Sequence, residues 1–343
     1  MVSMKDISKK CGVSVATVSK ALNGQKDICQ ETRKRICAAA EEMGYLASST
    51  ARALKTNRSY NLGMLLADQG RSGLDHEYFS TIVEGFKAEA ESRGYDITFI
   101  NTHTGDESTS YVRHCHCRGL DGVLVACISF EDPRIWELAG CNIPLVTVDY
   151  SFNGHTSVFS DNQHGTAALV RHAYEKGHRK IAFIHGDNTA VTQNRLSGFH
   201  HACQELGLSI PEEYIIPCIY HDPESCEKAT AQLLSLAEPP TCILFPDDFS
   251  FIGGHNAIRD TGYSIPGLPK SRKEMKISVM GYDGMNLARM MRLTSYFQNA
   301  WAIGKTAADR LIHRIEHPED STAEQIFIPG HLIEGITVQD IRK

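Results

Sequence analysis

The stretch GVSVATVSKALNG, residues 12–24, carries side chains suited to contact with a nucleic acid. If the stretch is helical, the apolar stripe that faces a core consists of Val18, Ala21 and Leu22. Val15, Ala16 and Lys20 then point away from that stripe. An apolar side chain can contact the methyl group of thymine, and a lysine one turn further on can reach guanine acceptors or a phosphate. The spacing therefore indicates a face that reads base edges, although a plain helical bundle would also tolerate Val15 and Ala16 on its surface.

A second set of polar residues follows apolar runs in the rest of the chain. They are Asp149 after PLVTV, Asp247 and Asp248 after CILFP, Asp283 after ISVMGY, and Arg195 at the start of a helical pattern. In open α/β sheets, ligands bind beyond the carboxyl ends of the strands. Carboxylates and a guanidinium that converge there can each make two hydrogen bonds, which suits a small polyhydroxylated ligand. The alternative is that each aspartate caps the helix after its strand, and for Asp248 we prefer that alternative.

The run HCHC, residues 114–117, contains two types of metal ligand. Consecutive residues of a helix point in different directions, and no second ligand pair stands at zinc-finger spacing. We therefore expect an ordinary helix and no metal site. The sequence also lacks a GxGxxG after its first strand, a Walker loop and a GxSxG elbow. We expect neither a cofactor nor an enzyme.

Three short helices can position the residues of the first stretch. The first spans residues 6–11 and is broken by Gly12, the second begins after the N-cap residue Ser14, and the third runs from residue 30 to a stop at Gly44. Two short helices joined by a tight turn and supported by a third form a helix-turn-helix, whose second helix enters the major groove. The side chains suited to phosphate contacts are Ser14, Thr17, Ser19 and Asn23.

The next segment, SSTARALKTNRSYN, can form a short helix over residues 50–55, capped by Ser48 or Ser49. A helix of one to two turns is unstable alone in water, and its one large apolar side chain, Leu54, has no core partner within the segment. One interpretation is a linker whose leucine rests on the next domain. The other is a hinge helix that orders on DNA and inserts Leu54 into the minor groove.

Charge separates the first sixty residues from the rest. Residues 1–60 hold eleven Lys/Arg and five Asp/Glu, whereas the remainder holds 24 Lys/Arg and 36 Asp/Glu. A basic head on an acidic body indicates that the head meets a polyanion. No apolar run is long enough for a transmembrane helix, and the N-terminus lacks the apolar core of a secretory signal. We therefore expect a cytoplasmic protein whose eleven cysteines are reduced thiols.

From Tyr60 onward, short apolar runs alternate with amphipathic stretches. The candidate strands are NLGMLLA, DITFIN, DGVLVA, PLVTVD, KIAFIH, CILFP and KISVMGY. Helical patterns lie between them, at residues 78–93, 164–176, 195–206 and 249–261. This alternation predicts parallel sheets covered by helices on both faces, arranged in two lobes.

Longer motifs extend along nearly the whole chain. In the first sixty residues they are GVSxxTVSxxLN, a later GY and ARAL, and beyond them they are FSDNQHGTAALVRHAYEKGHRKIAFI, NRLSGF, KISVMGYDGM and LTSYFQ. At this spacing the chain resembles the lactose-repressor (LacI/GalR) family of bacterial transcription regulators. The resemblance implies a small all-α helix-turn-helix head and an α/β body of two Rossmann-like lobes, similar to periplasmic sugar-binding proteins.

The resemblance also implies a division of the chain. We expect a DNA-binding head over residues 1–46, a hinge helix and linker over 47–59, and an effector-binding and dimerisation domain over 60–343. Within that domain we place the first lobe at about 60–160 plus a late C-terminal segment, and the second lobe at about 161–330.

Single residues take roles from the resemblance in the same way. The implied base readers are Val15, Ala16 and Lys20, and the implied minor-groove element is Leu54 with Lys55 beside it. Asp149, Arg195 and Asp283 stand at effector-binding positions, and Asp247 stands where such a repressor often has asparagine. The remaining effector-binding candidates are Tyr78 and Phe79 on the first lobe, together with His221 and Trp301.

The expected function is a sequence-specific DNA-binding transcriptional regulator, a repressor, controlled allosterically by a small effector bound between the lobes. We expect a homodimer on a near-palindromic DNA operator, because two heads must span two half-sites and the sequence ends without heptads. No membrane partner is expected. The expected effector is a sugar or sugar derivative, with purines left open. The alternatives are a solute-binding protein and a metabolite sensor controlled by a protein co-regulator.

Overall fold

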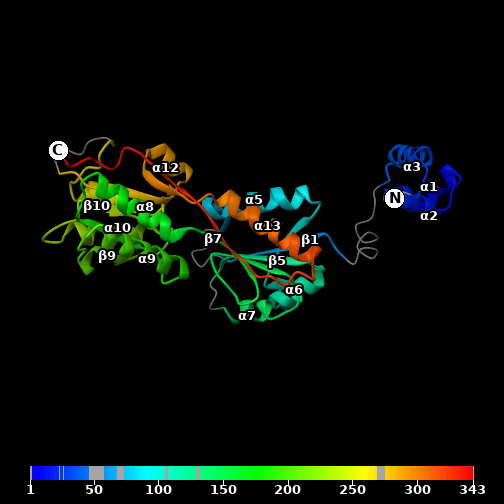
Figure 1. The fold of residues 1–343 in the computed structure, drawn as a ribbon, viewed down its shortest axis with the longest axis horizontal. Coiled ribbons are helices and arrows are strands. Elements are labelled where there is room, and N and C mark those ends of the chain that lie inside the picture. Colours follow the sequence, from blue (N-terminus) through cyan, green and yellow to red (C-terminus); the bar gives the residue numbers. More distant parts are fainter. Residues whose placement is uncertain are drawn as a thin grey trace. The chain divides into compact units, whose positions relative to one another are not determined.

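The structure is a computed structural model that describes residues 2–22, 24–25, 27–45, 58–67, 73–104, 107–128, 132–268 and 275–342. The chain divides into two compact units, Met1–Ser59 and Tyr60–Lys343, which are called the head and the body below. The described elements of the head are helices, and the body contains two large sheets with helices packed on them (Figure 1).

The head consists of α1 (Met4–Cys11), α2 (Val15–Leu22) and α3 (Gln30–Glu42), as the sequence predicts. Its core is apolar and comes from all three helices; the buried members are Ile7, Val18, Ala21, Ile36 and Ala40. Gly12 has a φ of 63°, the left-handed conformation that lets the chain turn sharply after α1. The Ser14 hydroxyl accepts a hydrogen bond from the Thr17 amide at 3.1 Å, which confirms Ser14 as the residue that caps α2.

The first lobe is built on a six-stranded parallel sheet. Its strand order is β13 (Gln325–Ile328), β7 (Thr156–Ser160), β6 (Leu145–Val148), β5 (Gly122–Ile128), β1 (Asn61–Ala67) and β2 (Asp96–Phe99). One face packs on α5 (Glu77–Ser92) and α13 (Ala300–Glu316), and the other on α6 (Tyr111–Arg118) and α7 (Pro133–Ala139). Glycines allow α5 and α13 to approach closely, since a Cβ on Gly85 would lie 2.1 Å from the Trp301 carbonyl oxygen.

The second lobe repeats this three-layer plan. Its strand order is β14 (His331–Ile333), β12 (Thr294–Phe297), β11 (Ser278–Asp283), β10 (Cys242–Leu244), β8 (Ile181–His185) and β9 (Ile215–Pro217). Only β14 pairs antiparallel among these described strands. One face packs on α10 (Pro223–Leu234) and α11 (Phe251–Asp260), and the other on α8 (Asn162–Glu175) and α9 (Ala190–Glu205). A short α12 (Asn286–Met291) follows β11.

The C-terminal part of the chain divides between the lobes differently from our expectation. We assigned residues up to about 330 to the second lobe, which is wrong for α13 and β13, because α13 packs on α5 and β13 pairs with β7 in the first lobe. Phe327 of β13 also stacks on Phe159 of β7, with ring centroids 5.1 Å apart. The chain then returns to the second lobe, where β14 pairs with β12.

Candidate functional site

The predicted base-reading face lies on α2. Val15, Ala16 and Lys20 are exposed there, while Val18 and Ala21 of the same helix are buried in the head core. Ser14 is also exposed, and Thr17 and Ser19 are half-buried. The predicted residues Asn23, Leu54 and Lys55 lie outside the described residues.

In the body, the predicted polar residues come from strand ends and one helix. Asp149 follows β6, Asp283 ends β11, and Arg195 lies on α9. Asp149 and Asp283 have positive φ values of 59° and 104°, which a non-glycine residue adopts when its surroundings hold it there. The Arg195 guanidinium lies 4.0 Å from the Asp283 carboxylate, with both side chains about 5% exposed. These residues form one polar cluster, in which Arg195 and Asp283 are buried and Asp149 is half-buried. We call this cluster the interlobe site.

Arg195 is held in place by neutral acceptors. Its Nε donates to Asn162 Oδ1 at 2.7 Å and its Nη1 donates to the Pro246 carbonyl at 2.7 Å. Its guanidinium carbon lies 3.6 Å from the centroid of the Tyr282 ring. Because a guanidinium has five N–H donors on a rigid plane, the anchored group retains donors that can be directed toward a ligand.

The two carboxylates of the interlobe site favour protonation more than ordinary aspartates do. Burial raises the pKa of Asp283 well above its usual value, against the opposing effect of Arg195. Burial also raises the pKa of Asp149, whose carboxylate accepts from the Tyr78 hydroxyl at 3.0 Å and from the Ser160 amide at 3.1 Å. A carboxyl group that gains a proton can donate as well as accept, so the site can satisfy both kinds of ligand group.

We expected Asp248 to cap the helix after its strand, but Asp247 is the aspartate that bonds within the turn before that helix. Asp247 accepts from the Ser250 amide and hydroxyl, each at 2.7 Å, in the turn that leads into α11. Asp248 instead accepts from the Met285 amide at 2.8 Å and the Ser295 hydroxyl at 2.7 Å. The expectation that Asp248 caps the next helix is therefore wrong, because its side chain points toward the β11–α12 loop. Burial raises the pKa of Asp248 to about 7.

Rings from both lobes meet beside this cluster. Tyr78 is buried and Phe79 half-buried on the first turn of α5, where His76 is the N-cap residue. The His76 ring contacts the ring of His221 in the second lobe, and His221 stacks on Phe249 with an angle of 19° between the ring planes. The two lobes are thus in direct contact through aromatic side chains.

Two further contacts cross between the lobes. Both oxygens of Glu77, the first residue of α5, accept from the Asn286 amide at the start of α12, at 3.1 Å each. The Met285 side chain, one residue earlier, packs in the first-lobe core with Tyr78 and Ile82. These contacts join the two lobes directly.

Trp301 lies apart from the cluster. It is 45% exposed on α13, and its ring lies 5.4 Å from the Lys305 ammonium. The sequence reasoning also missed residues that complete the site: Asn162, Met285 and Gln298, whose amide donates to Asp283. Asn162 stands in the motif FSDNQHG as the first residue of α8, two positions after the end of β7. A polar side chain so near the carboxyl end of a strand is the signal that could have revealed it.

The HCHC run lies on α6, as expected. His114 and Cys115 are buried, whereas His116 and Cys117 are exposed, so the four side chains do not converge. Within the described ranges, no group of three or more His, Cys, Asp or Glu residues is arranged to hold a metal ion. In those same ranges, no helix is long and apolar enough to cross a membrane.

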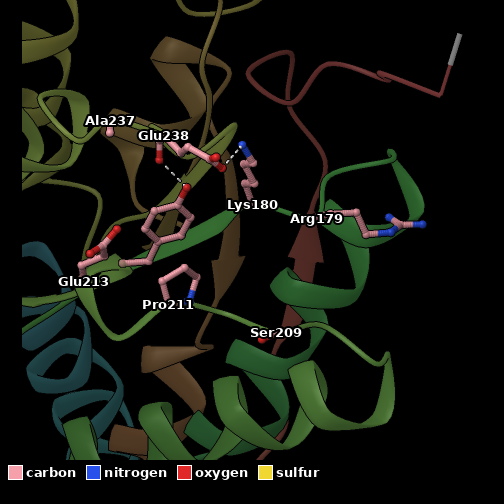
Figure 2. A pocket seen from close by; sticks show the side chains of 8 residues that line it. Arg179, Lys180, Ser209, Pro211, Glu213, Ala237 and Glu238 are labelled. Carbon is pink, nitrogen blue, oxygen red and sulfur yellow. Dashed lines mark hydrogen bonds and ion pairs between the residues drawn. The ribbon is translucent and has the colours of Figure 1, made fainter.

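A cavity of about 400 Å³ lies at the other edge of the second-lobe sheet, near the amino ends of β8, β9 and β10 (Figure 2). Its polar groups bind one another, since Lys180 Nζ donates to the Glu238 carboxylate at 2.8 Å and the Tyr214 hydroxyl donates to the Glu238 carbonyl at 2.6 Å. Ligands of open α/β sheets bind beyond the carboxyl ends instead. We therefore retain the interlobe site as the candidate.

Comparisons with known families decide the identity of the whole chain. A model of the periplasmic binding proteins and sugar binding domain of the LacI family matches residues 59–334. A model of bacterial regulatory proteins of the lacI family matches residues 3–48. The chain belongs to the LacI family. It is a DNA-binding transcriptional regulator with an effector-binding body, as the sequence motifs predict.

LacI-family relatives match along the full length. The HTH-type transcriptional repressor PurR of Proteus mirabilis is 30% identical over 348 residues, covering 99% of this chain and 98% of the relative. PurR of Haemophilus influenzae is 27% identical over 349 residues, covering 99% and 100%. These relatives support the family assignment.

Solved structures of the family have the same fold. The Lac repressor dimer bound to operator and the anti-inducer ONPF aligns with a TM-score of 0.79 at 23% identity, covering 98% of this chain and 99% of that one. The complex of the transcriptional regulator CelR with cellobiose aligns with a TM-score of 0.69 at 21% identity, covering 98% and 100%. The likeness confirms the predicted architecture of a helical head and a two-lobed α/β body.

Proposed function

We propose that this LacI-family protein is a transcriptional repressor that binds a near-palindromic operator as a homodimer and responds to a small effector held between its lobes. The observation that carries the proposal is the interlobe site, where Arg195 and Asp283 are buried together at the carboxyl end of β11. In open α/β sheets ligands bind at that end of the strands, and a few buried polar or charged groups fix their orientation there.

The head supplies the DNA-binding part of the proposal. Val15 and Ala16 are exposed at the start of α2, where the second helix of a helix-turn-helix meets base edges. Lys20 is exposed one turn further on. A dimer brings two such heads to two half-sites, which is why the operator is expected to be nearly palindromic. The relatives named as transcriptional repressors, and the Lac repressor dimer on its operator, support this assignment.

The chemistry of the interlobe site favours a ligand with several hydroxyl groups. Asp149 and Asp283 offer acceptors, and Arg195 offers donors, so each can bind two groups of a ligand at once. A sugar or sugar derivative presents hydroxyls that both donate and accept. The fold shared with a cellobiose complex, and with a LacI-family regulator solved with bound ribose, supports a sugar.

One observation favours a second effector class. His76 and Phe79 from the first lobe and His221 and Phe249 from the second place their rings together, and the last two are nearly parallel. Flat rings bind aromatic faces by offset stacking. A planar nitrogen heterocycle such as a purine base is therefore the alternative effector, with Arg195 and Asp283 as its polar partners.

Control of DNA binding follows from the contacts that close the lobes. Asp283, the effector-binding candidate, is two residues from Met285, which is buried in the first-lobe core. An effector shifts the equilibrium between closed and open bodies only as far as its affinities for the two states differ. That shift changes the separation of the two chains' heads and hence their fit to two half-sites.

A two-part experiment tests the proposal. Selection from a random DNA library should return a near-palindromic sequence whose binding weakens as salt is raised. A thermal-shift screen of the full chain against sugars, sugar phosphates and nucleobases should identify the effector, because ligand at 100 times its Kd adds about 2.7 kcal/mol of stability.

Variants of the body test whether the effector binds at the interlobe site. The shift should be lost in Asp283→Asn and Arg195→Lys, which retains a positive charge beside Asp283. It should persist in Arg171→Ala, which removes an arginine from an exposed ion pair with Glu205. A shift that survives both interlobe variants would place the effector elsewhere, and a library that returns no preferred sequence would contradict the regulator itself.

A further inference from the structure

Tyr60, the first residue of the body, has an unusual backbone conformation. Its φ is 58°, in the left-handed region. A bulky residue rarely adopts this conformation, because its Cβ then crowds the neighbouring carbonyl oxygen. Such a conformation costs free energy and persists only where the surrounding structure holds it.

The other described non-glycine residues with positive φ have an evident reason for it. Asp149 and Asp283 belong to the interlobe site, and His221 is one of the rings beside it. Arg292 and Asn299 are the residues that end α12 and begin α13. Tyr60 is in neither situation. It directly precedes β1, at the point where the chain enters the body from the head.

Contacts from the starts of neighbouring strands hold Tyr60 on both sides. Its amide donates to Asp121 Oδ2 at 2.8 Å, and its carbonyl accepts from the amide of Asp96, the first residue of β2, at 2.8 Å. Its half-buried ring packs on the Tyr95 ring, with centroids 5.2 Å apart. Asp121, which directly precedes β5, also donates its own amide to the Asn61 carbonyl at 2.9 Å. The direction in which the chain enters the body is therefore fixed.

This direction matters because little chain separates Tyr60 from the expected hinge helix over residues 50–55. Residues 56–59 lie between them, and four residues span at most about 14 Å. Successive base pairs of DNA are about 3.4 Å apart. If Tyr60 turned freely, each hinge would reach any point within that radius, and two chains would fit half-sites at several spacings. A fixed direction removes most of these arrangements.

We propose that Tyr60 is a positioning residue that restricts the dimer to operators of one half-site spacing. The inference rests on the proposed homodimer on a near-palindromic operator. When two heads are joined, the second binding event is intramolecular, and its effective concentration depends on the length and stiffness of the connection. A narrow range of head separations raises this concentration at the matching spacing and lowers it at every other spacing. Tyr60 therefore increases both operator affinity and discrimination against altered spacing.

The test uses the full-length protein and three variants. Tyr60→Ala removes the ring but keeps the cost of the left-handed conformation, so the backbone is no longer held there. Asp121→Ala removes the acceptor of the Tyr60 amide and leaves Tyr60 itself intact. Tyr263→Ala is the matched control, because Tyr263 is a half-buried tyrosine that packs on the second-lobe core.

Each protein is titrated with the selected operator, with duplexes whose centre is longer or shorter by one or two base pairs, and with a single half-site. For the unmodified protein, we expect a change of one base pair to weaken binding at least about ten-fold. Tyr60→Ala and Asp121→Ala should bind the operator about five- to ten-fold more weakly, with the one-base-pair penalty reduced to about two- to three-fold. Half-site affinity should not change, because the head is unaltered. Tyr263→Ala should keep the full penalty.

Two outcomes overturn the inference while the proposed function stands. If Tyr60→Ala and Asp121→Ala keep the full spacing penalty, Tyr60 does not set the spacing. If Tyr263→Ala reduces the penalty as much as they do, the effect is a general loss of stability. Should Tyr60→Ala fail to fold, Asp121→Ala decides. Failure of the proposed function has a different signature, since the unmodified protein would then bind the operator no better than a single half-site.

Discussion

Met285 is the side chain whose truncation should most directly open the body. It is 8% exposed and packs in the first-lobe core, although it belongs to the β11–α12 loop of the second lobe. Its amide donates to Asp248 in the second lobe at 2.8 Å. A side chain held by its backbone in one lobe and buried in the other must leave the first-lobe core when the lobes separate.

The size of the effect follows from that burial. Complete burial of a methionine side chain contributes about 1.5–3 kcal/mol. Met285→Ala removes most of this from the closed body and little from an open body, where residue 285 is already in water. A loss of about 2 kcal/mol corresponds to roughly a 30-fold shift toward the open form.

Hydrogen exchange of the full-length protein measures this shift without an effector. The Asn286 amide donates to Glu77 across the lobes, so its exchange reports the opening. In Met285→Ala, exchange in residues 284–291 should accelerate by roughly 30-fold, with the central strands unaffected. Met280→Ala is the matched control, because Met280 is fully buried within the second-lobe core alone. If both variants accelerate residues 284–291 to the same extent, Met285 does not hold the lobes together and the reasoning is refuted.

Three further variants test other parts of the structure. Gly85→Ala should destabilise the first lobe by about 1–3 kcal/mol or more in urea unfolding, because its Cβ would lie 2.1 Å from the backbone of α13. Gly140→Ala, where a Cβ would lie 3.3 Å from its nearest neighbour, should cost clearly less. Asn162→Ala should cost about 1–3 kcal/mol, since it leaves the buried Nε of Arg195 without its acceptor; an unchanged midpoint would argue against this anchor. Asp248→Asn should flatten the pH dependence of the free energy of unfolding. In the folded protein the Asp248 carboxyl has its pKa raised to about 7, so it keeps a proton that the unfolded chain loses near pH 4. The wild type therefore loses stability as the pH rises from 4 to 7. Unfolding at pH 5 and pH 8 should show the variant gaining on the wild type by on the order of 2 kcal/mol at the higher pH, and equal slopes would contradict the assignment.

The parts of the fold that sequence reasoning predicted are the buried central strands. All seven predicted runs lie on strands, because parallel strands covered on both faces read as continuous apolar stretches. The described strands that it missed are β7, β9, β12, β13 and β14 of the two large sheets, and the pair β3 (His103–Thr104) and β4 (Glu107–Ser108). Each of them has five residues or fewer, and β7 and β12 carry several hydroxyl side chains. Ser157 and Ser295 are fully buried, which becomes possible because Ser157 bonds to Thr147 and Ser295 to Asp248. These partners come from other strands and loops, so a local pattern could not reveal them.

The interlobe site was predictable to the extent that it depends on strand ends. Asp283 and Arg195 come together because the carboxyl ends of parallel strands share one edge, a property of the fold class. Which of Asp247 and Asp248 faces the turn was not predictable, because adjacent residues leaving a strand point in opposite directions and the turn decides between them. The same limit hid Met285, whose apolar side chain looks like any helix-flanking residue in sequence. Yet the position of Met285 connects the interlobe site to the contact between the lobes. A ligand that moves Asp283 also moves Met285, two residues later, whose side chain packs in the first-lobe core. Coupling over so short a segment requires no long pathway, only a loop with two packed arrangements that the ligand binds unequally.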